Sequence, residues 1–252
     1  MQTVIIGSGN VAYHLVKAFK QNNLEIHQIF GRNEGELSKI SNEFHIPYST
    51  EKLEDAELYI IAVSDSAVEN VSELIKNENA LVAHTSGSLP MKIMNGNYRK
   101  ASFYPLQTFS KNKNLDYSKI PFFIEADNQI DEKSLMELAS IISDNVEVST
   151  YEKRKYIHLT AVFACNFVNH LFARAKEISD SQDLDFNYFI PLIDETVEKI
   201  HHLDPKSAQT GPAVRGDERI LQLHEELISD EEHLKIYRLM NESIKKMYEK
   251  SE

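Results

Sequence analysis

The chain has 252 residues, of which 42% are hydrophobic, and a formal net charge of −12. This length and apolar content predict one large or two modest globular domains. Acidic residues outnumber basic residues in both halves of the chain, so neither half is a basic tail or arm. This charge distribution argues against nucleic acid and anionic membranes as partners.

Cysteine usage, the start of the chain and the histidines narrow the class of protein. Cys165 is the only cysteine, so no internal disulfide can form, which is typical of a reducing compartment. The chain enters the apolar run T-V-I-I-G directly, without a signal-peptide pattern, and no segment has the ~20 apolar residues of a membrane span. We therefore expect a cytoplasmic protein and no membrane partner.

His201 and His202 lack further ligands at a recognised spacing, so we expect no metal site.

The first 150 residues alternate short β-branched runs with helical patterns. The expected strands begin near Thr3, Glu25, Leu58, Ala80, Ala101 and Pro121, and V-E-V-S-T follows at 146–150. The expected crossover helices begin near Asn10, Glu36 and Ser66. Continuous apolar strands with helices between them are typical of a parallel sheet covered on both faces. Residues 1–150 are therefore predicted to form an α/β domain.

The rest of the chain reads as helix after helix. One helical pattern covers about 152–181, a second covers about 186–203, and two more flank Ser229. Strand signals are absent from this region. Residues 151–252 are therefore predicted to form an all-helical domain.

The first expected strand ends in G-S-G-N-V-A, with the G-x-G-x-x-G/A spacing. Gly7 permits a tight turn, Gly9 lets the backbone approach a pyrophosphate, and Ala12 lets helix and strand pack closely. The motif follows a strand and opens a helix, which is the context that a dinucleotide site requires. The alternative is a turn that binds nothing. The expected cofactor-binding residues of this loop are Gly7, Ser8, Gly9, Asn10 and Val11.

The end of the second strand indicates which dinucleotide binds. NAD-binding domains usually place an acid there to hold the ribose 2′-OH. Here the strand ends in I-F-G-R-N, with Arg32 and Asn33 and no acid before Glu34. The planar guanidinium of Arg32 suits a 2′-phosphate, so NADP(H) is the expected cofactor. The alternative is a solvated surface arginine.

Two further strand ends carry candidate site residues. Ligands of open parallel sheets bind at the carboxyl ends of the strands. The run L-Y-I-I-A-V-S ends at Ala62, Val63 and Ser64, and L-V-A-H-T-S-G-S ends at 84–88. Both ends are expected to flank the nicotinamide. Alternatively, the hydroxyls of Thr85 and Ser86 cap the following turn.

The helix expected around Leu159–Ala173 is apolar almost all round and should be buried in its domain. At ~100° per residue its polar positions share one face. Those positions are His158, Asn166, Asn169 and His170, with Val162 between them. Buried amides need partners, so this face should meet either a ligand or a structural network.

The loop A-Q-T-G-P-A-V-R-G-D, residues 208–217, separates two helices of the second domain. Pro212 should end one helix, and Asp217 can cap the next. Arg215 has no role in such a connector and could meet a carboxylate or phosphate.

Several motifs together resemble bacterial proteins that join a Rossmann-like domain to a helical domain of unknown function. The motifs are G-S-G-N-V-A-Y-H-L, H-T-S-G-S-L, Y-P-L-Q-T-F, H-L-T-A-V-F-A-C-N-F-V-N-H-L and L-D-P-K-S-A-Q-T-G-P-A-V-R-G-D, and they cover nearly the whole chain. Such proteins are described as NADP oxidoreductases similar to deazaflavin-dependent NADP reductases, pyrroline-carboxylate reductases, ketopantoate reductases and β-hydroxyacid dehydrogenases.

The resemblance implies a Rossmann-like parallel sheet followed by an all-α domain of the hydroxyacid dehydrogenase and ketopantoate reductase type. It also implies a homodimer through the helical domain and an active site in the cleft between domains. Those two enzyme classes use a lysine four residues before an asparagine. If Asn166 matches that asparagine, Val162 replaces the lysine, which is the usual proton donor. His158, one turn earlier, is the nearest substitute.

The sequence therefore predicts an NADP(H)-dependent oxidoreductase that transfers hydride between nicotinamide and a small carbonyl, imine or deazaflavin substrate. The alternative, favoured by Val162, is a binding protein that uses NADP as a signal or structural ligand without turnover. The residues expected near the reacting centre are His84, Ser86, His158 and Asn166. The residues expected to contact substrate or an anion are Thr85, Gln107, Asn169 and Arg215.

Overall fold

The computed structural model describes residues 1–249 and places the chain in two compact units. The first unit ends at Asn166 and the second begins at Phe167. The sheet ends close to the expected boundary at Thr150, but the next helix belongs to the first unit. The domain boundary at residue 150 stays a prediction.

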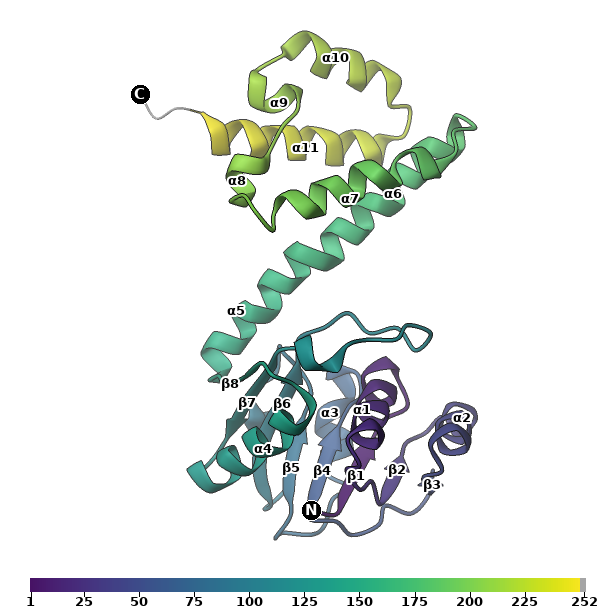
Figure 1. The fold of residues 1–252 in the computed structure, drawn as a ribbon, viewed down its shortest axis with the longest axis vertical. Helices are drawn as coiled ribbons and strands as arrows, with labels where there is room; N and C mark the ends of the chain where they lie inside the picture. Colours follow the sequence, from purple (N-terminus) through teal and green to yellow (C-terminus); the bar gives the residue numbers. More distant parts are fainter. Residues whose placement is uncertain (250–252) are drawn as a thin grey trace. The chain divides into compact units, whose positions relative to one another are not determined.

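The first unit is built on one eight-stranded sheet with the order β3-β2-β1-β4-β5-β6-β7-β8 (Figure 1). Its strands are β1 (Thr3–Ile6), β2 (Gln28–Phe30), β3 (Tyr48–Ser49), β4 (Leu58–Ile61), β5 (Leu81–His84), β6 (Arg99–Pro105), β7 (Phe122–Ala126) and β8 (Val146–Val148). The predicted α/β fold is confirmed, and the two-residue strand β3 adds an edge for which the sequence carries no signal.

The predicted parallel sheet contains one antiparallel pair of strands. Strand β7 runs antiparallel to β6, whereas every other neighbouring pair is parallel. A parallel return needs a crossover, usually a helix, across the face of the sheet. The loop between β6 and β7 contains only a single 3₁₀ turn, Tyr117–Lys119, so the chain returns in the opposite direction.

Each face of the sheet carries its own apolar core. Alternate strand residues point to opposite faces, so Ile5 and Ile60 join one core while Val4 and Ile61 join the other. Helices α1, α2 and α4 cover the first face and α3 covers the second (Figure 1). The helices of this unit are α1 (Asn10–Gln21), α2 (Glu34–Phe44), α3 (Asp65–Ser72), α4 (Gln129–Ile142) and α5 (Tyr151–Ala161).

The second unit is helical, as predicted. Its helices are α6 (Val168–Ser181), α7 (Ile190–Lys199), α8 (Pro205–Ala208), α9 (Pro212–Arg215), α10 (Glu218–Leu227) and α11 (Glu231–Tyr248). Asp217 caps α10 by accepting a hydrogen bond from the Ile220 N–H, as expected. Within residues 1–249, no helix is long and apolar enough to cross a membrane.

The long helix around residue 165 differs from its prediction in two ways. The helical backbone is continuous from Tyr151 to Ser181, but Val162–Phe167 is π-helical, so the regular spacing behind the predicted polar face does not hold. The helix is also half-exposed or exposed over most of its length instead of buried. Periodicity and apolar content predict a helix, but they do not show whether other segments of the same chain bury its apolar side chains.

Candidate functional site

The glycine loop has the backbone that its sequence predicts. Gly7 has φ +135°, a region that favours glycine, and a Cβ there would lie 2.1 Å from the carbonyl oxygen of Ala62. The Gly7 N–H donates to the Phe30 carbonyl at 2.7 Å, which joins the ends of β1 and β2. Gly7 therefore holds three strand ends close together.

Gly9 leaves the start of α1 open. It is the N-cap residue of α1, and no side chain caps the first N–H groups there. A Cβ on Gly9 would meet no atom within 4 Å, so there is open space beside Gly9. Free N–H groups at a helix N-terminus attract a phosphate. The uncapped start of α1 therefore fits the diphosphate of a dinucleotide, and the binding roles of Ser8, Asn10 and Val11 stay predictions.

The end of β2 presents a free cation. Arg32 is exposed and forms no ion pair within residues 1–249. Asn33 next to it caps α2, because its side chain accepts a hydrogen bond from the Glu36 N–H at 3.1 Å. Asn33 thus has a structural contact that the sequence analysis did not assign, while Arg32 is available for an anion.

A lysine from the β6–β7 loop reaches the same region. The Lys111 ammonium donates to the carbonyl oxygen of Ser8 at 2.9 Å and forms an ion pair with Glu36. Lys111 and then Lys39 lower the pKa of Glu36 to about 2, so this carboxylate stays ionised. Lys111 was not predicted as a site residue.

The ends of β4 and β5 support turns. Ser64 is the N-cap residue of α3 and makes no capping hydrogen bond with its side chain. The Ser86 hydroxyl accepts hydrogen bonds from the Ser88 and Leu89 N–H groups at 3.0 and 3.1 Å, and the Thr85 hydroxyl donates to the Ile61 carbonyl at 3.3 Å. These contacts favour the capping alternative for Ser86, whereas Thr85 contacts the end of β4 instead of the following turn, and the binding roles of both residues stay predictions.

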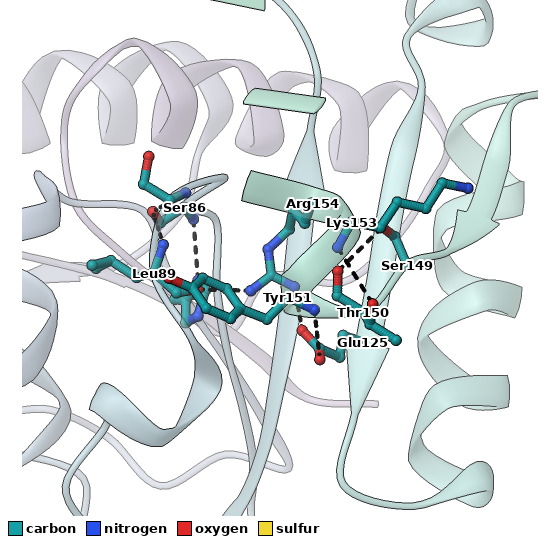
Figure 2. A network of polar contacts seen from close by, with 10 residues as sticks. Ser86, Leu89, Glu125, Ser149, Thr150, Tyr151, Lys153 and Arg154 are labelled. Carbon is teal, nitrogen blue, oxygen red and sulfur yellow. Dashed lines mark hydrogen bonds and ion pairs between the residues drawn. The ribbon is translucent and has the colours of Figure 1, made fainter. Parts of the chain in front are cut away.

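A buried ion pair joins α5 to the sheet (Figure 2). Arg154, with 0% exposure, binds Glu125 of β7 and donates to the Leu89 carbonyl at 2.7 Å. The other Glu125 oxygen accepts the Tyr151 N–H at 2.9 Å. This network fixes the first turn of α5 against both β7 and the turn at 86–89.

One helical turn after Arg154, His158 meets a tyrosine. Its Nδ1 lies 2.9 Å from the hydroxyl oxygen of Tyr104, at the end of β6. Both side chains lie directly over Gly87, where a Cβ would come within 2.7 Å of Tyr104 and 2.8 Å of His158. Burial is the main cause that raises the pKa of Tyr104 to about 12. The phenol therefore stays protonated at neutral pH.

The Tyr104–His158 pair lies in the wall of a pocket of about 830 Å³. The pocket brings together two residues predicted for the reacting centre, His158 and Asn166, and one predicted for the substrate, Gln107. Its lining is Tyr104, Leu106, Gln107, Thr108, Lys153, Tyr156, Ile157, His158, Thr160, Ala161, Ala164, Cys165 and Asn166. These residues all belong to the first unit.

His84 lies outside this pocket. Its side chain is 0% exposed, and its Nδ1 accepts the Ser86 N–H at 3.2 Å. Burial, followed by the positive charge of Arg154, lowers the pKa of His84 to about 3, while an interaction with the Pro90 carbonyl acts in the opposite direction. His84 is therefore neutral at physiological pH and supports the turn; its predicted place near the reacting centre is not tested.

Asn169 and Arg215 belong to the second unit, where both are exposed. Arg215 ends the short helix α9, which lies between Gly211 at φ +114° and Gly216 at φ +67°. The glycines thus serve the backbone of the loop, and the contact partner of Arg215 stays a prediction. Within residues 1–249 no cluster of three metal-ligating side chains occurs.

Sequence reasoning assigned no site role to Tyr104, Arg154 or Lys111, which contact residues of the candidate site. The segments Y-P-L-Q-T-F and H-T-S-G-S-L include residues 104 and 87, but neither segment shows that the chain brings residues 87, 104 and 158 together. No local signal marks Arg154, because Glu152, Lys153 and Lys155 beside it in the sequence are also charged.

Two protein families match the chain. Residues 2–86 match the NADP oxidoreductase, coenzyme F420-dependent family, and residues 120–244 match the domain of unknown function DUF2520. Among curated proteins, no sequence matches the chain.

Solved structures match the chain along its length. The "putative NADP oxidoreductase" of Bacteroides fragilis is 40% identical, with a TM-score of 0.92 and coverage of 97% of this chain and 98% of that one. A pyrroline-5-carboxylate reductase of Streptococcus pyogenes is 12% identical, with a TM-score of 0.66 and 98% of each chain covered. An imine reductase of Myxococcus stipitatus in complex with NADP⁺ is 12% identical, with a TM-score of 0.65 and coverage of 98% and 92%. The last two show a shared fold.

Proposed function

Because the chain belongs to the family of NADP oxidoreductases that carry a DUF2520 domain, we propose that it reduces or oxidises a small carbonyl or imine compound with NADP(H). The observation that carries the proposal is the Tyr104–His158 hydrogen bond in the wall of a pocket of about 830 Å³. This pair supplies a group that can donate a proton. The lysine that does so in related enzymes is replaced by Val162 in this chain.

The cofactor fits the ends of two neighbouring parallel strands, β1 and β2. The glycine loop after β1 leaves room for a diphosphate, and Arg32 after β2 is free to pair with a 2′-phosphate. When bound, NADPH supplies a hydride from its nicotinamide. The protein must then hold the substrate, exclude water and deliver one proton to the oxygen or nitrogen atom of the reduced bond.

His158 is the group that we assign to the proton. In the tautomer that we assign, the Tyr104 hydroxyl, protonated at neutral pH, donates to Nδ1 of His158, which leaves Nε2 to exchange a proton with the substrate. Tyr104 fixes the ring orientation. Asn166, which lines the same pocket, can hydrogen-bond the substrate's polar atom.

Activity and cofactor binding test this proposal separately. NADPH oxidation is followed with a panel of carbonyls, imines and flavins, and the binding of NADPH and NADH is measured by nicotinamide fluorescence. His158→Asn and Tyr104→Phe should lower kcat by about 100-fold or more and leave the NADPH affinity nearly unchanged. Tyr156→Phe, on an exposed tyrosine of the same pocket, is the matched control.

Other outcomes would overturn parts of the proposal. Equal affinity for NADPH and NADH would show that Arg32 does not recognise a 2′-phosphate. Tight NADPH binding with no oxidation of any compound would favour the alternative, a protein that binds the cofactor without turnover. If neither dinucleotide bound, both functions would fail.

We also propose that the second unit forms a homodimer. Helix α7 and the turn after it expose large apolar side chains, namely Ile190, Leu192, Val197, Ile200 and Leu203. Apolar side chains gathered in this way mark an interaction surface in most proteins. A second copy is the occupant that we favour, because symmetric dimers are the commonest assemblies of a single chain.

A further inference from the structure

The β6–β7 loop, residues 106–121, is attached to the helix whose N-terminus faces the cofactor site. His14 of α1 donates from Nε2 to the Ser110 carbonyl at 2.9 Å and accepts at Nδ1 from the Tyr117 hydroxyl at 2.7 Å. Farther along α1, Lys17 donates to Asn114 at 2.7 Å. These contacts bind the loop to α1 at three points, so the position of Ser110 is set by the helix.

Lys111 follows Ser110 and turns toward the glycine loop. Its ammonium donates to the Ser8 carbonyl, which lies between the two glycines of the motif, and pairs with Glu36. It also lies 6.0 Å from the centre of the Tyr13 ring. An ammonium has three N–H donors, and two of the three are used by these oxygens. The charge therefore stands next to the open start of α1, with one donor left.

We propose that Lys111 is a cofactor-binding residue whose ammonium contacts the diphosphate of NADP(H). This inference rests on the proposed function. A lysine acts on phosphate as a point charge and needs no fixed fork geometry, which suits a side chain that reaches in from a neighbouring loop. The Ser8 carbonyl holds Lys111 at the turn where the diphosphate binds, and the Glu36 carboxylate competes with the diphosphate for its charge.

The competition distinguishes this role from a structural one. If Lys111 only ties the loop to the glycine turn, then the loss of either Lys111 or Glu36 loosens the same contact. If Lys111 binds the diphosphate, then removing the Glu36 charge leaves the ammonium less neutralised and should favour the anion. If the role of Lys111 is structural, the two substitutions should change the affinity for the dinucleotide in the same direction. If Lys111 binds the diphosphate, they should change it in opposite directions.

The test measures the dissociation constants of NADPH and NADH for the full chain at several salt concentrations. The chain contains no tryptophan, so the nicotinamide fluorescence is read directly. Lys111→Met should raise both constants by about tenfold and reduce their dependence on salt, since both dinucleotides carry the diphosphate. Lys113→Met is the matched control, because Lys113 is an exposed lysine of the same loop, and it should leave both constants unchanged.

Glu36→Gln should lower both dissociation constants several-fold, since it keeps the shape of the side chain and removes its charge. A weaker affinity in Glu36→Gln would overturn the proposal, and so would a Lys111→Met variant that binds as the unaltered chain does. An effect of Lys111→Met on NADPH alone would also overturn it, because the 2′-phosphate would then be the ligand. If the unaltered chain bound neither dinucleotide, the proposed function itself would fail.

Discussion

The two units of this chain differ in where their apolar side chains lie. Among the described residues, almost every buried hydrophobic side chain belongs to the first unit, and only Ala213 and Leu221 are in the second. The second unit instead exposes large apolar side chains along α7, α10 and α11. The sheet unit thus carries its own core, whereas the helical unit needs further cover. Different substitutions should therefore harm the two units.

The largest expected effect concerns the buried charges of the sheet unit. Glu125→Gln would leave Arg154 buried without its counter-ion, which should cost about 3 to 5 kcal/mol in the free energy of unfolding. Urea unfolding at neutral pH measures this change. Glu147→Gln is the control, because Glu147 pairs with Lys153 at 3.6 Å on the exposed side of the same helix start. Equal effects of both variants would refute the role of burial.

The next effect concerns the packing around the site rather than the stability of its unit. Gly87→Ala would push against Tyr104 and His158, so turnover should fall by about 100-fold while the protein stays folded. Steady-state kinetics and thermal unfolding together measure this. Gly35→Ala is the control, because a Cβ there meets only the Asn33 side chain, at 3.6 Å. Unchanged turnover in Gly87→Ala would remove the Tyr104–His158 pair from our proposal.

The helical unit should respond in its association rather than its fold. Leu192→Glu places a charge on a side chain that is 65% exposed in the single chain, and should weaken the proposed dimer by about tenfold or more. Sedimentation equilibrium measures the dissociation constant. Ile130→Glu, at a position 78% exposed on α4 of the sheet unit, should leave association unchanged. A dimer that tolerates Leu192→Glu would place its interface elsewhere.

The smallest effect is a dependence of stability on pH in the sheet unit. The pKa of His84 is about 3 in the folded protein and near 6.5 when the side chain is free. Between these pH values the unfolded chain binds a proton at His84 that the folded chain does not. The contribution of neutral His84 to the free energy of unfolding is therefore complete above pH 6.5 and is lost as the pH falls toward 3.

His84→Gln should therefore flatten the loss of stability between pH 7 and pH 5, as measured by urea midpoints at both values. His14 keeps its own contribution, because burial lowers its pKa as well. The dependence of the urea midpoint on pH should therefore become weaker without disappearing. An unchanged dependence would mean that His84 can be protonated in the folded protein.

Local signals explain how much of the fold could be predicted. The strands and crossover helices of the first unit follow apolar runs of a few residues, and the turn at Gly7 depends on its own backbone angle and on the neighbouring Ala62 carbonyl. The antiparallel return of β7 depends on the absence of a crossover helix, which is a weaker signal. The exposure of the helix around residue 165 depends on which other segments pack against it, and the periodicity of the helix itself does not indicate this.

The glycine loop, the family and the order of an α/β part before a helical part can all be predicted from the amino-acid sequence, because they depend on spacings within short segments. Which polar groups contact one another, by contrast, depends on how the chain packs. His158 contacts Tyr104 over Gly87, and Lys111 contacts the Ser8 carbonyl, across separations of 54 and 103 residues along the chain. Such contacts form where packed strands and helices bring distant segments together, and no local pattern encodes that meeting.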